Sequence, residues 1–264
     1  MSAKVVWQTK SPIVLESFKQ KKITSIIKGG NVYNFQAAIA LAMKFDVTID
    51  ESAIKQDYHN VLKYYLRHRL NTPQADVTVK ENYPVVVGAI NKNSKNIALI
   101  HHIDKINSGQ SYGHKVFFVE LFRKLRKMDL VITVSEYWKI FLEEHGCKNV
   151  KVIYNSFVPE DYKIEQNDVV EFRKKYSIPD RPIVYIGNAH KQKGVYEAYN
   201  ALKGLDVELI MTEAQNMASD LPVRFLSLSR KEFITLLHAS EVVVLMLKLM
   251  EGWNRVAHEA LLCN

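Results

Sequence analysis

Short, continuously apolar runs alternate with longer amphipathic stretches along most of the chain. Apolar runs without polar alternation are typical of strands buried on both faces, and the stretches between them predict the helices that cover a parallel sheet. The first series of expected strands is 22–27, 46–49, 84–90, 96–102, 129–135 and 150–155, and its helices are 32–45, 53–70, 114–127 and 136–146. The first 20 residues do not fit this alternation, and we expect them to add an edge strand.

A second series of the same kind begins after the polar segment 156–168, which we interpret as a linker. Its expected strands are 182–187, 207–212, 223–228 and 242–248, and its helices are 169–176, 195–204, 230–239 and one that begins after 254. The sequence therefore predicts an α/β fold of two Rossmann-like, doubly wound domains, residues 1–157 and 158–264. Such sheets bind ligands at the carboxyl ends of their strands, so we expect the domains to face each other across a ligand cleft.

Composition and charge narrow the possible partners. No apolar run is long enough to cross a membrane, and the N-terminus lacks a signal-peptide core. The two cysteines, Cys147 and Cys263, have no metal-binding spacing and fit a reducing cytoplasm. Residues 1–157 hold 23 Lys and Arg against 13 Asp and Glu, whereas residues 158–264 hold 13 against 15. This asymmetry favours an anionic partner of the first half, but a solvated lysine-rich surface explains it equally well.

Two expected strand ends in the first half carry residues suited to a site. Gly29 and Gly30 follow the strand 22–27, where they could expose amides to an anion or simply form a tight turn. His101 and His102 end the strand 96–102 and are placed for hydrogen bonding or proton transfer, although ordinary loop histidines would look the same.

Two further strand ends lie in the second half. The loop IGNAHKQKG (186–194) combines a glycine turn with His190 and Lys193, which suits a diphosphate although it lacks the full P-loop pattern. The stretch EGWNRVAHEALLCN (251–264) places Glu251 in a loop and Glu259 on a helix that Asn254 caps. Two surface glutamates on an exposed helix are the simpler interpretation of this pair.

Taken in order, these segments resemble the retaining glycosyltransferases of the GT-B fold, family 4 of the sequence-based classification. The resemblance covers most of residues 22–264. The most specific segments are VITVSEYWKIFLEEHG…VKVIYNSF, IVYIGNAHKQKG and LLHASEVVVLMLKLMEGWNRVAHEALLCN, the last of which contains the E-x7-E motif of the family. The resemblance implies a hexosyl transfer from a nucleotide-diphosphate sugar with retention of configuration. The first domain would then bind the acceptor and the second domain the donor.

The resemblance also implies roles for individual residues. Glu251 would contact the hydroxyls of the donor sugar, Glu259 the ribose, and one of His101 and His102 would lie near the reacting sugar. The remaining donor-binding positions would be Gly29, Gly30, Gly187, Asn188, His190, Lys193, Leu226, Ser227, Gly252, Trp253 and Asn254. Since no Asp-x-Asp pair is present to hold a metal, Lys193 and backbone amides would offset the charge of the leaving diphosphate. We therefore expect no metal and no cofactor besides the sugar nucleotide.

The sequence departs from the family pattern at three places. Asn188 occupies a position that commonly holds Arg, the turn after Glu251 is Gly-Trp-Asn, and the chain ends where relatives continue, so that the second domain is short. These departures support an alternative, a glycosyltransferase-like binding module with weak or no catalysis. The basic amphipathic helix 114–127 could contact a membrane surface, or its apolar stripe could pack on the sheet. Specific nucleic-acid binding has charge in its favour but no motif.

Overall fold

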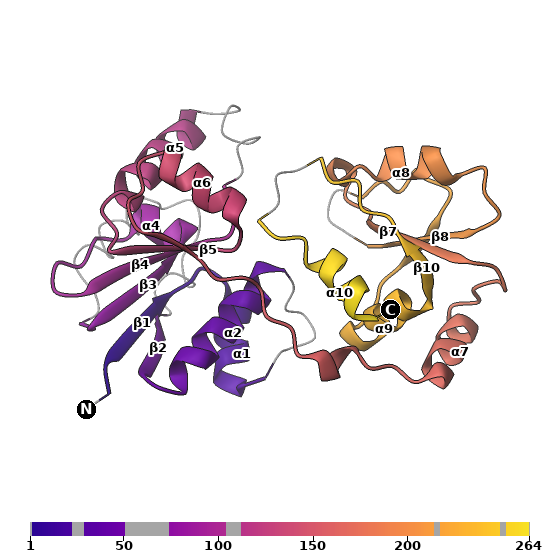
Figure 1. The fold of residues 1–264 in the computed structure, drawn as a ribbon, viewed down its shortest axis with the longest axis horizontal. Helices are drawn as coiled ribbons and strands as arrows, with labels where there is room; N and C mark the ends of the chain where they lie inside the picture. The colour runs from indigo at the N-terminus through magenta and orange to yellow at the C-terminus, as the bar shows by residue number, and fades with distance from the viewer. Residues whose placement is uncertain are drawn as a thin grey trace. The chain divides into compact units, whose positions relative to one another are not determined.

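A computed structural model describes residues 2–22, 29–50, 74–103, 112–213, 217–248 and 252–263. The chain forms two compact units, Met1–Ser156 and Phe157–Asn264, each an α/β layered structure with a parallel sheet (Figure 1). Within the described part of the chain, no helix is long and apolar enough to cross a membrane.

The sheet of unit 1 has six parallel strands in the order β2-β1-β3-β4-β5-β6. The strands are β1 (Lys4–Gln8), β2 (Asp46–Asp50), β3 (Val77–Glu81), β4 (Lys95–Ile100), β5 (Leu130–Thr133) and β6 (Val150–Val152). The chain moves outward from β1 to β2 and then returns to the other side of β1 with β3. The strand order therefore reverses between β1 and β3, which is where ligands bind in folds of this kind.

Helices cover both faces of this sheet (Figure 1). Helices α1 (Pro12–Gln20) and α2 (Gly30–Ala42) pack against each other, whereas α4 (Asn82–Val87), α5 (Tyr112–Leu125) and α6 (Glu136–Glu144) surround a second core cluster. The Ser11 and Ser135 hydroxyls cap α1 and α6 by accepting from the Val14 and Trp138 amides. The largest side chains of the core, Trp7 and Trp138, are 1% and 0% exposed.

Unit 2 contains a four-stranded parallel sheet in the order β10-β7-β8-β9. Its strands are β7 (Ile183–Asn188), β8 (Glu208–Thr212), β9 (Arg224–Leu226) and β10 (Ser240–Val243). Its helices are α7 (Gln166–Lys175), α8 (Val195–Leu202), α9 (Arg230–Ala239) and α10 (Arg255–Cys263), with 3-10 turns η4 (Pro159–Tyr162) and η5 (Lys191–Lys193). The strand order reverses between β7 and β10. Separate core clusters occupy the two faces of the sheet, which confirms the prediction of an α/β fold with parallel sheets.

Several expected elements differ from those observed. Strand β1 is not an edge strand but lies inside the sheet, bonded to β2 and β3. Strand β3 was not predicted, and the strand expected at 242–248 is observed as β10 at Ser240–Val243. The proposed linker contains η4, whose Tyr162 is 3% exposed within the core of unit 2. The expected helix 53–70 and nearly all of the expected strand 22–27 lie outside the described residues.

The run PVVVGAI, expected to be a strand, instead forms α4 and the turn after it. Periodicity cannot separate a short buried strand from a short buried helix, and Pro84 to Val87 are all buried. The carbonyls at the end of this helix are bonded by a buried lysine of α5. Lys124 Nζ donates to Val86 O at 2.5 Å and to Gly88 O at 2.7 Å. Leu121 and Leu125 of α5 are also fully buried, so the apolar stripe of α5 packs in the core.

Lys124 should therefore contribute to stability as a hydrogen-bond donor inside unit 1. Lys124→Met keeps the aliphatic stem but leaves the two carbonyls without their donor, and we expect the free energy of unfolding to fall by about 1–3 kcal/mol. Lys127→Met, a control at an exposed position of the following turn, should change it by less than about 0.5 kcal/mol. Urea unfolding measures both variants, and equal effects would show that the carbonyl contacts contribute nothing.

Candidate functional site

In unit 1, polar side chains meet at the carboxyl ends of β1, β3 and β4. Glu81 ends β3, and its carboxylate accepts from Trp7 Nε1 at 3.1 Å and from Thr9 Oγ1 at 2.8 Å. Asn34 of α2 also hydrogen-bonds to Glu81, and its Oδ1 lies 2.6 Å from His101 Nε2. A continuous series of hydrogen bonds therefore joins Glu81 through Asn34 to His101, at the point where the strand order reverses.

The surroundings of His101 keep its imidazole neutral. The Tyr33 ring meets it edge to face at 5.0 Å between ring centroids, and a Cβ atom at Gly30 would lie 3.4 Å from the ring. Burial, and next the neighbouring His102, lower the pKa of His101 to about 4. Burial also raises the pKa of Glu81 to about 7, although its hydrogen-bond donors act in the opposite direction.

The structure thus separates the two histidines and places the two glycines. His101 belongs to the polar group, whereas the His102 side chain is exposed and its backbone O accepts from Asn82 Nδ2 at 3.1 Å. Gly29, with φ +57°, is the residue before α2, and Gly30 is the first residue of that helix. Glu81, Asn34 and Thr9 were missed from the sequence, because β3 was not predicted and nothing in the sequence links Asn34 to His101.

In unit 2, the predicted donor-binding residues of β7 and η5 lie beside the segment that follows β10. Gly187 has φ +86°, and the nearest atom to a Cβ built on it is from Leu245, at 3.5 Å. A Cβ at Gly194 would lie 1.8 Å from Met246 O, so any side chain there would force the two segments apart. Lys248 and Glu197 also form an ion pair between these segments. The turn at Gly194 and the segment after β10 are therefore in close contact.

Polar groups of β7 and the following turn lie at this edge. Asn188 is the last residue of β7, and its buried Oδ1 has no hydrogen-bond partner among the described residues. His190 Nδ1 accepts from the Gln192 amide at 3.3 Å and thereby caps η5, which ends at Lys193. Ser227 is exposed just after β9, whereas the Leu226 side chain packs in the core.

The N-terminus of α10 follows the sequence prediction at Asn254. Its Oδ1 accepts from the Ala257 amide at 3.3 Å, as expected of a helix cap. Gly252 and Trp253 precede it, and the Trp253 indole stacks on His258 with 4.4 Å between ring centroids. Phe157 stacks with the same histidine at 6.1 Å. Glu251, expected to contact the sugar, lies outside the described residues.

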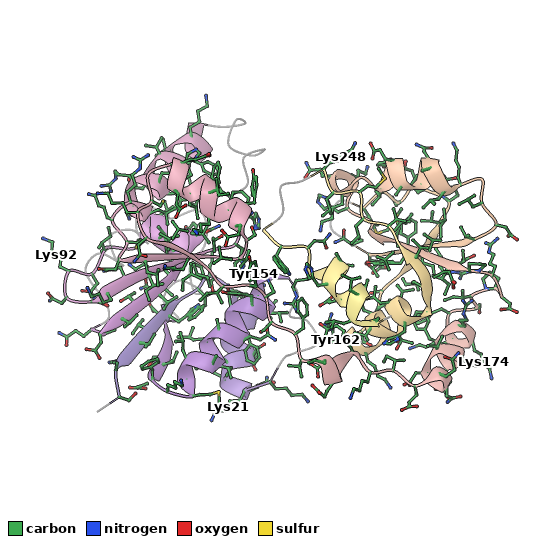
Figure 2. The ribbon with its side chains drawn as sticks, in the orientation of Figure 1. Lys21, Lys92, Tyr154, Tyr162, Lys174 and Lys248 are labelled. Atoms are coloured by element: carbon green, nitrogen blue, oxygen red, sulfur yellow. The ribbon has the colours of Figure 1, made fainter. Side chains whose placement is uncertain are left out.

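Glu259 is buried rather than available on the helix surface. Its side chain is 4% exposed, and Oε1 accepts from Arg230 Nη2 at 2.9 Å, Tyr162 Oη at 3.3 Å and Arg255 Nη2 at 3.4 Å. Burial, and next the charge of Glu259, raise the pKa of Tyr162 to about 12, so the hydroxyl keeps its proton and donates (Tyr162 is labelled in Figure 2). Tyr162, Arg230 and Arg255 were not found from the sequence; Arg255, four residues before Glu259, was the one with a spacing signal.

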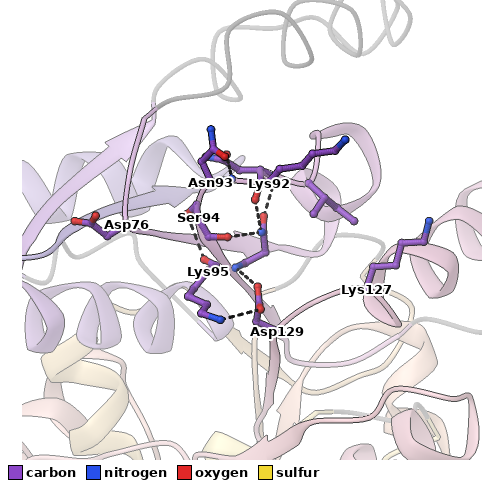
Figure 3. Close-up of a pocket in the computed structure, with 10 residues that line it drawn as sticks. Asp76, Lys92, Asn93, Ser94, Lys95, Lys127 and Asp129 are labelled. Atoms are coloured by element: carbon purple, nitrogen blue, oxygen red, sulfur yellow. Dashed lines mark hydrogen bonds and ion pairs between the residues drawn. The ribbon is translucent and has the colours of Figure 1, made fainter.

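Two cavities of the described residues lie at the opposite, amino edges of the sheets. One of about 570 Å³ is lined by loops before β3, β4 and β5 (Figure 3). Its polar groups bond among themselves: Asn96 Nδ2 donates to Asn91 O and Ser94 O, and Asp129 accepts from the Asn96 amide. The other, of similar size, surrounds Arg181, Glu208 and Arg224 in unit 2. Neither contains a predicted site residue. Among the described residues, no three His, Cys, Asp or Glu side chains gather as a metal site.

The fold is that of the GT-B glycosyltransferases, α/β proteins whose units carry parallel sheets. Among solved structures, the chain is similar to a sucrose-phosphate synthase from Thermosynechococcus elongatus, with a TM-score of 0.73 and 14% identity over 99% of this chain and 79% of that one. It is similar to Anabaena HepE in complex with UDP-glucose, with a TM-score of 0.65 and 18% identity over 99% and 78% of the chains. It is also similar to the trehalose-6-phosphate synthase OtsA, with a TM-score of 0.63 and 12% identity over 99% of this chain and 82% of that one. No family model and no curated protein matches the sequence.

Glu259 should stabilise unit 2 through its charge. Glu259→Gln keeps the shape of the side chain but leaves Arg230 and Arg255 without their counter-ion, and we expect the free energy of unfolding to fall by about 1–3 kcal/mol. Arg230 is 40% exposed, so water screens part of the repulsion and keeps the loss moderate. The exposed Glu241→Gln is the control, and urea unfolding is the measurement. A loss no larger than that of the control would contradict a stabilising role.

Glu81 should make the free energy of unfolding fall as the pH rises, whereas an ion-paired carboxylate would make it rise. Its pKa rises from 4.5 to about 7 on folding, so the folded state binds more protons in that window and stability falls as the pH rises through it. Between pH 4 and 8, the stability of the wild type relative to Glu81→Gln should fall by about 2–3 kcal/mol. Urea unfolding across this range tests it, since the other titrating groups are common to both proteins. A difference that is constant with pH would exclude the raised pKa.

Proposed function

We propose that the protein is a glycosyltransferase that moves a sugar from a nucleotide-diphosphate sugar to an acceptor, with retention of configuration and without a metal. One observation carries the proposal: in a GT-B fold, unit 2 brings β7, η5 and the start of α10 to the edge where its strand order reverses. Ligands bind at this edge in doubly wound sheets. The similar HepE structure, which contains UDP-glucose, supports a nucleotide sugar as the ligand.

The residues of unit 2 suit the donor. Transfer breaks the bond between the anomeric carbon and a phosphate oxygen, so negative charge grows on the diphosphate as the sugar becomes cationic. Lys193 would offset that charge, and the backbone at Gly187 would allow the phosphates to come close. Glu251, Gly252, Trp253 and Asn254 would hold the sugar. In unit 1, His101 is the histidine that we assign to the reacting sugar, because its ring bonds to Asn34 within the polar group.

Glu259 remains our proposed ribose ligand, but under a constraint that the sequence did not suggest. Ribose hydroxyls would share this carboxylate with Arg230, Arg255 and Tyr162, which already donate to Oε1. Because these three donors all reach Oε1, a hydroxyl of the ligand would add to a carboxylate that is already held in place. This arrangement orients the carboxylate before the ligand arrives, which lowers the entropic cost of binding.

The alternative is a glycosyltransferase-like module that binds the sugar nucleotide with little or no transfer. Asn188 favours it, because a neutral amide stands where the resembling family commonly places an arginine that would stabilise the leaving diphosphate. Binding and turnover separate the two functions. Radiolabelled UDP-glucose that is bound but neither hydrolysed nor transferred would favour the binding module.

A nucleoside diphosphate should raise the melting temperature, because a ligand that binds only the folded state stabilises it. At about tenfold above the dissociation constant the gain is about 1.4 kcal/mol, which corresponds to a few degrees. Lys193→Gln should weaken the shift, whereas Lys203→Gln, an exposed lysine after α8, should not. Differential scanning fluorimetry with UDP and GDP measures it. If neither UDP nor GDP shifts the melting temperature of the folded protein, the proposed function is contradicted.

A further inference from the structure

Three donors converge on the Glu81 carboxylate in unit 1, and this fixes the direction of the hydrogen bonds around it. Trp7 Nε1 can only donate, and Thr9 donates to Glu81 while its Oγ1 accepts from the Ser11 amide at 3.0 Å. An ionised carboxylate has acceptor sites but no donor, so Asn34 must face Glu81 with its NH₂ group. Above the pKa of Glu81, which is about 7, the carboxylate can only accept and thereby determines the amide orientation of Asn34.

The orientation of Asn34 in turn selects the protonated nitrogen of His101. With NH₂ toward Glu81, Asn34 presents Oδ1 to His101, as the 2.6 Å contact with Nε2 shows. An amide oxygen accepts, so Nε2 must carry the proton of the neutral imidazole. The other nitrogen, Nδ1, is then the acceptor of the ring, and no described residue supplies it with a donor.

We propose that Glu81 and Asn34 are positioning residues that hold His101 as its Nε2–H tautomer and so keep Nδ1 as a hydrogen-bond acceptor for a hydroxyl of the ligand. Asn34 is 4% exposed and Thr9 is fully buried, so water does not compete easily for this network. The hydroxyl as partner rests on the proposed function, since a sugar provides hydroxyl donors. The tautomer itself follows from unit 1 alone.

The test is the imidazole ¹⁵N spectrum of histidine-labelled protein at pH 8, where Glu81 is ionised. A two-bond ¹H–¹⁵N correlation distinguishes a protonated ring nitrogen from an unprotonated one, and His101→Gln assigns the signals. We expect a single Nε2–H tautomer in the wild type and in Glu81→Asp, which keeps an acceptor-only group. Glu81→Gln and Asn34→Ala should each give a mixture of tautomers, because Asn34 can then turn or is absent. Glu143→Gln, an exposed change of the same kind on α6, should match the wild type.

Two variants that break the network at different points keep the test decisive if one of them fails to fold. A single Nε2–H tautomer in whichever folded variant is measured, or an Nδ1–H tautomer in the wild type, overturns the proposal. A mixture of tautomers in the variants supports the tautomer proposal even if UDP has no effect on the melting temperature. The two results therefore distinguish failure of the tautomer proposal from failure of the proposed function.

Turnover supplies the second measurement. If the wild type turns over UDP-glucose, Glu81→Gln should lower kcat by roughly twofold to tenfold, because the molecules that carry the Nδ1–H tautomer offer the ligand hydroxyl no acceptor. The UDP-induced melting shift should stay unchanged, because Glu81 is not among the residues assigned to the nucleotide. Glu81→Asp should recover most of the lost activity. An unchanged kcat in a variant with mixed tautomers would overturn the role proposed for Nδ1.

Discussion

Parallel pairing on both sides of β1 and β7 is the constraint on which both units depend. Each of these strands is bonded to two parallel neighbours, so all carboxyl ends lie at one edge of each sheet. The chain must cross over a face between paired strands, and helices make those crossings. Residues as distant in sequence as Thr9, Glu81 and His101 meet at one edge for this reason.

Charged groups inside the two units are stabilised in different ways. In unit 1, Lys124 donates to backbone carbonyls at the end of α4, which have no donor within the helix. In unit 2, the carboxylate of Glu259 accepts hydrogen bonds from two guanidinium groups and a phenol. The first arrangement supports the fold at some distance from the carboxyl edge. The second lies on a proposed ligand-binding helix, so the same contacts serve stability and the orientation of a functional group.

The sequence predicted the general organisation well, because hydrophobic runs and helix caps are local signals. The parallel sheets, the Asn254 cap and the glycine turn at the end of β7 all follow from residues close together in the chain. The prediction failed where local signals conflict with packing: PVVVGAI has strand-like residues but forms a helix, and β3, with Thr78 and Lys80 buried among apolar residues, was overlooked. The hydrogen-bond partners of Glu259 and His101 could not be predicted for a related reason. Arg230 and Asn34 reach them through tertiary contacts, and no spacing records such contacts.

The three tryptophans divide between the units in a useful way. Trp7 and Trp138 are enclosed in the core of unit 1, whereas Trp253 is partly accessible in unit 2, stacked on a histidine beside the start of α10. An imidazole against an indole alters its emission, and a nucleotide placed at that helix would disturb the stack. The chain therefore carries an intrinsic optical probe of the carboxyl edge of unit 2. Of the two other indoles, Trp7 donates to Glu81 and so reports on the polar group of unit 1, whereas Trp138 lies in the core between α4, α5 and α6.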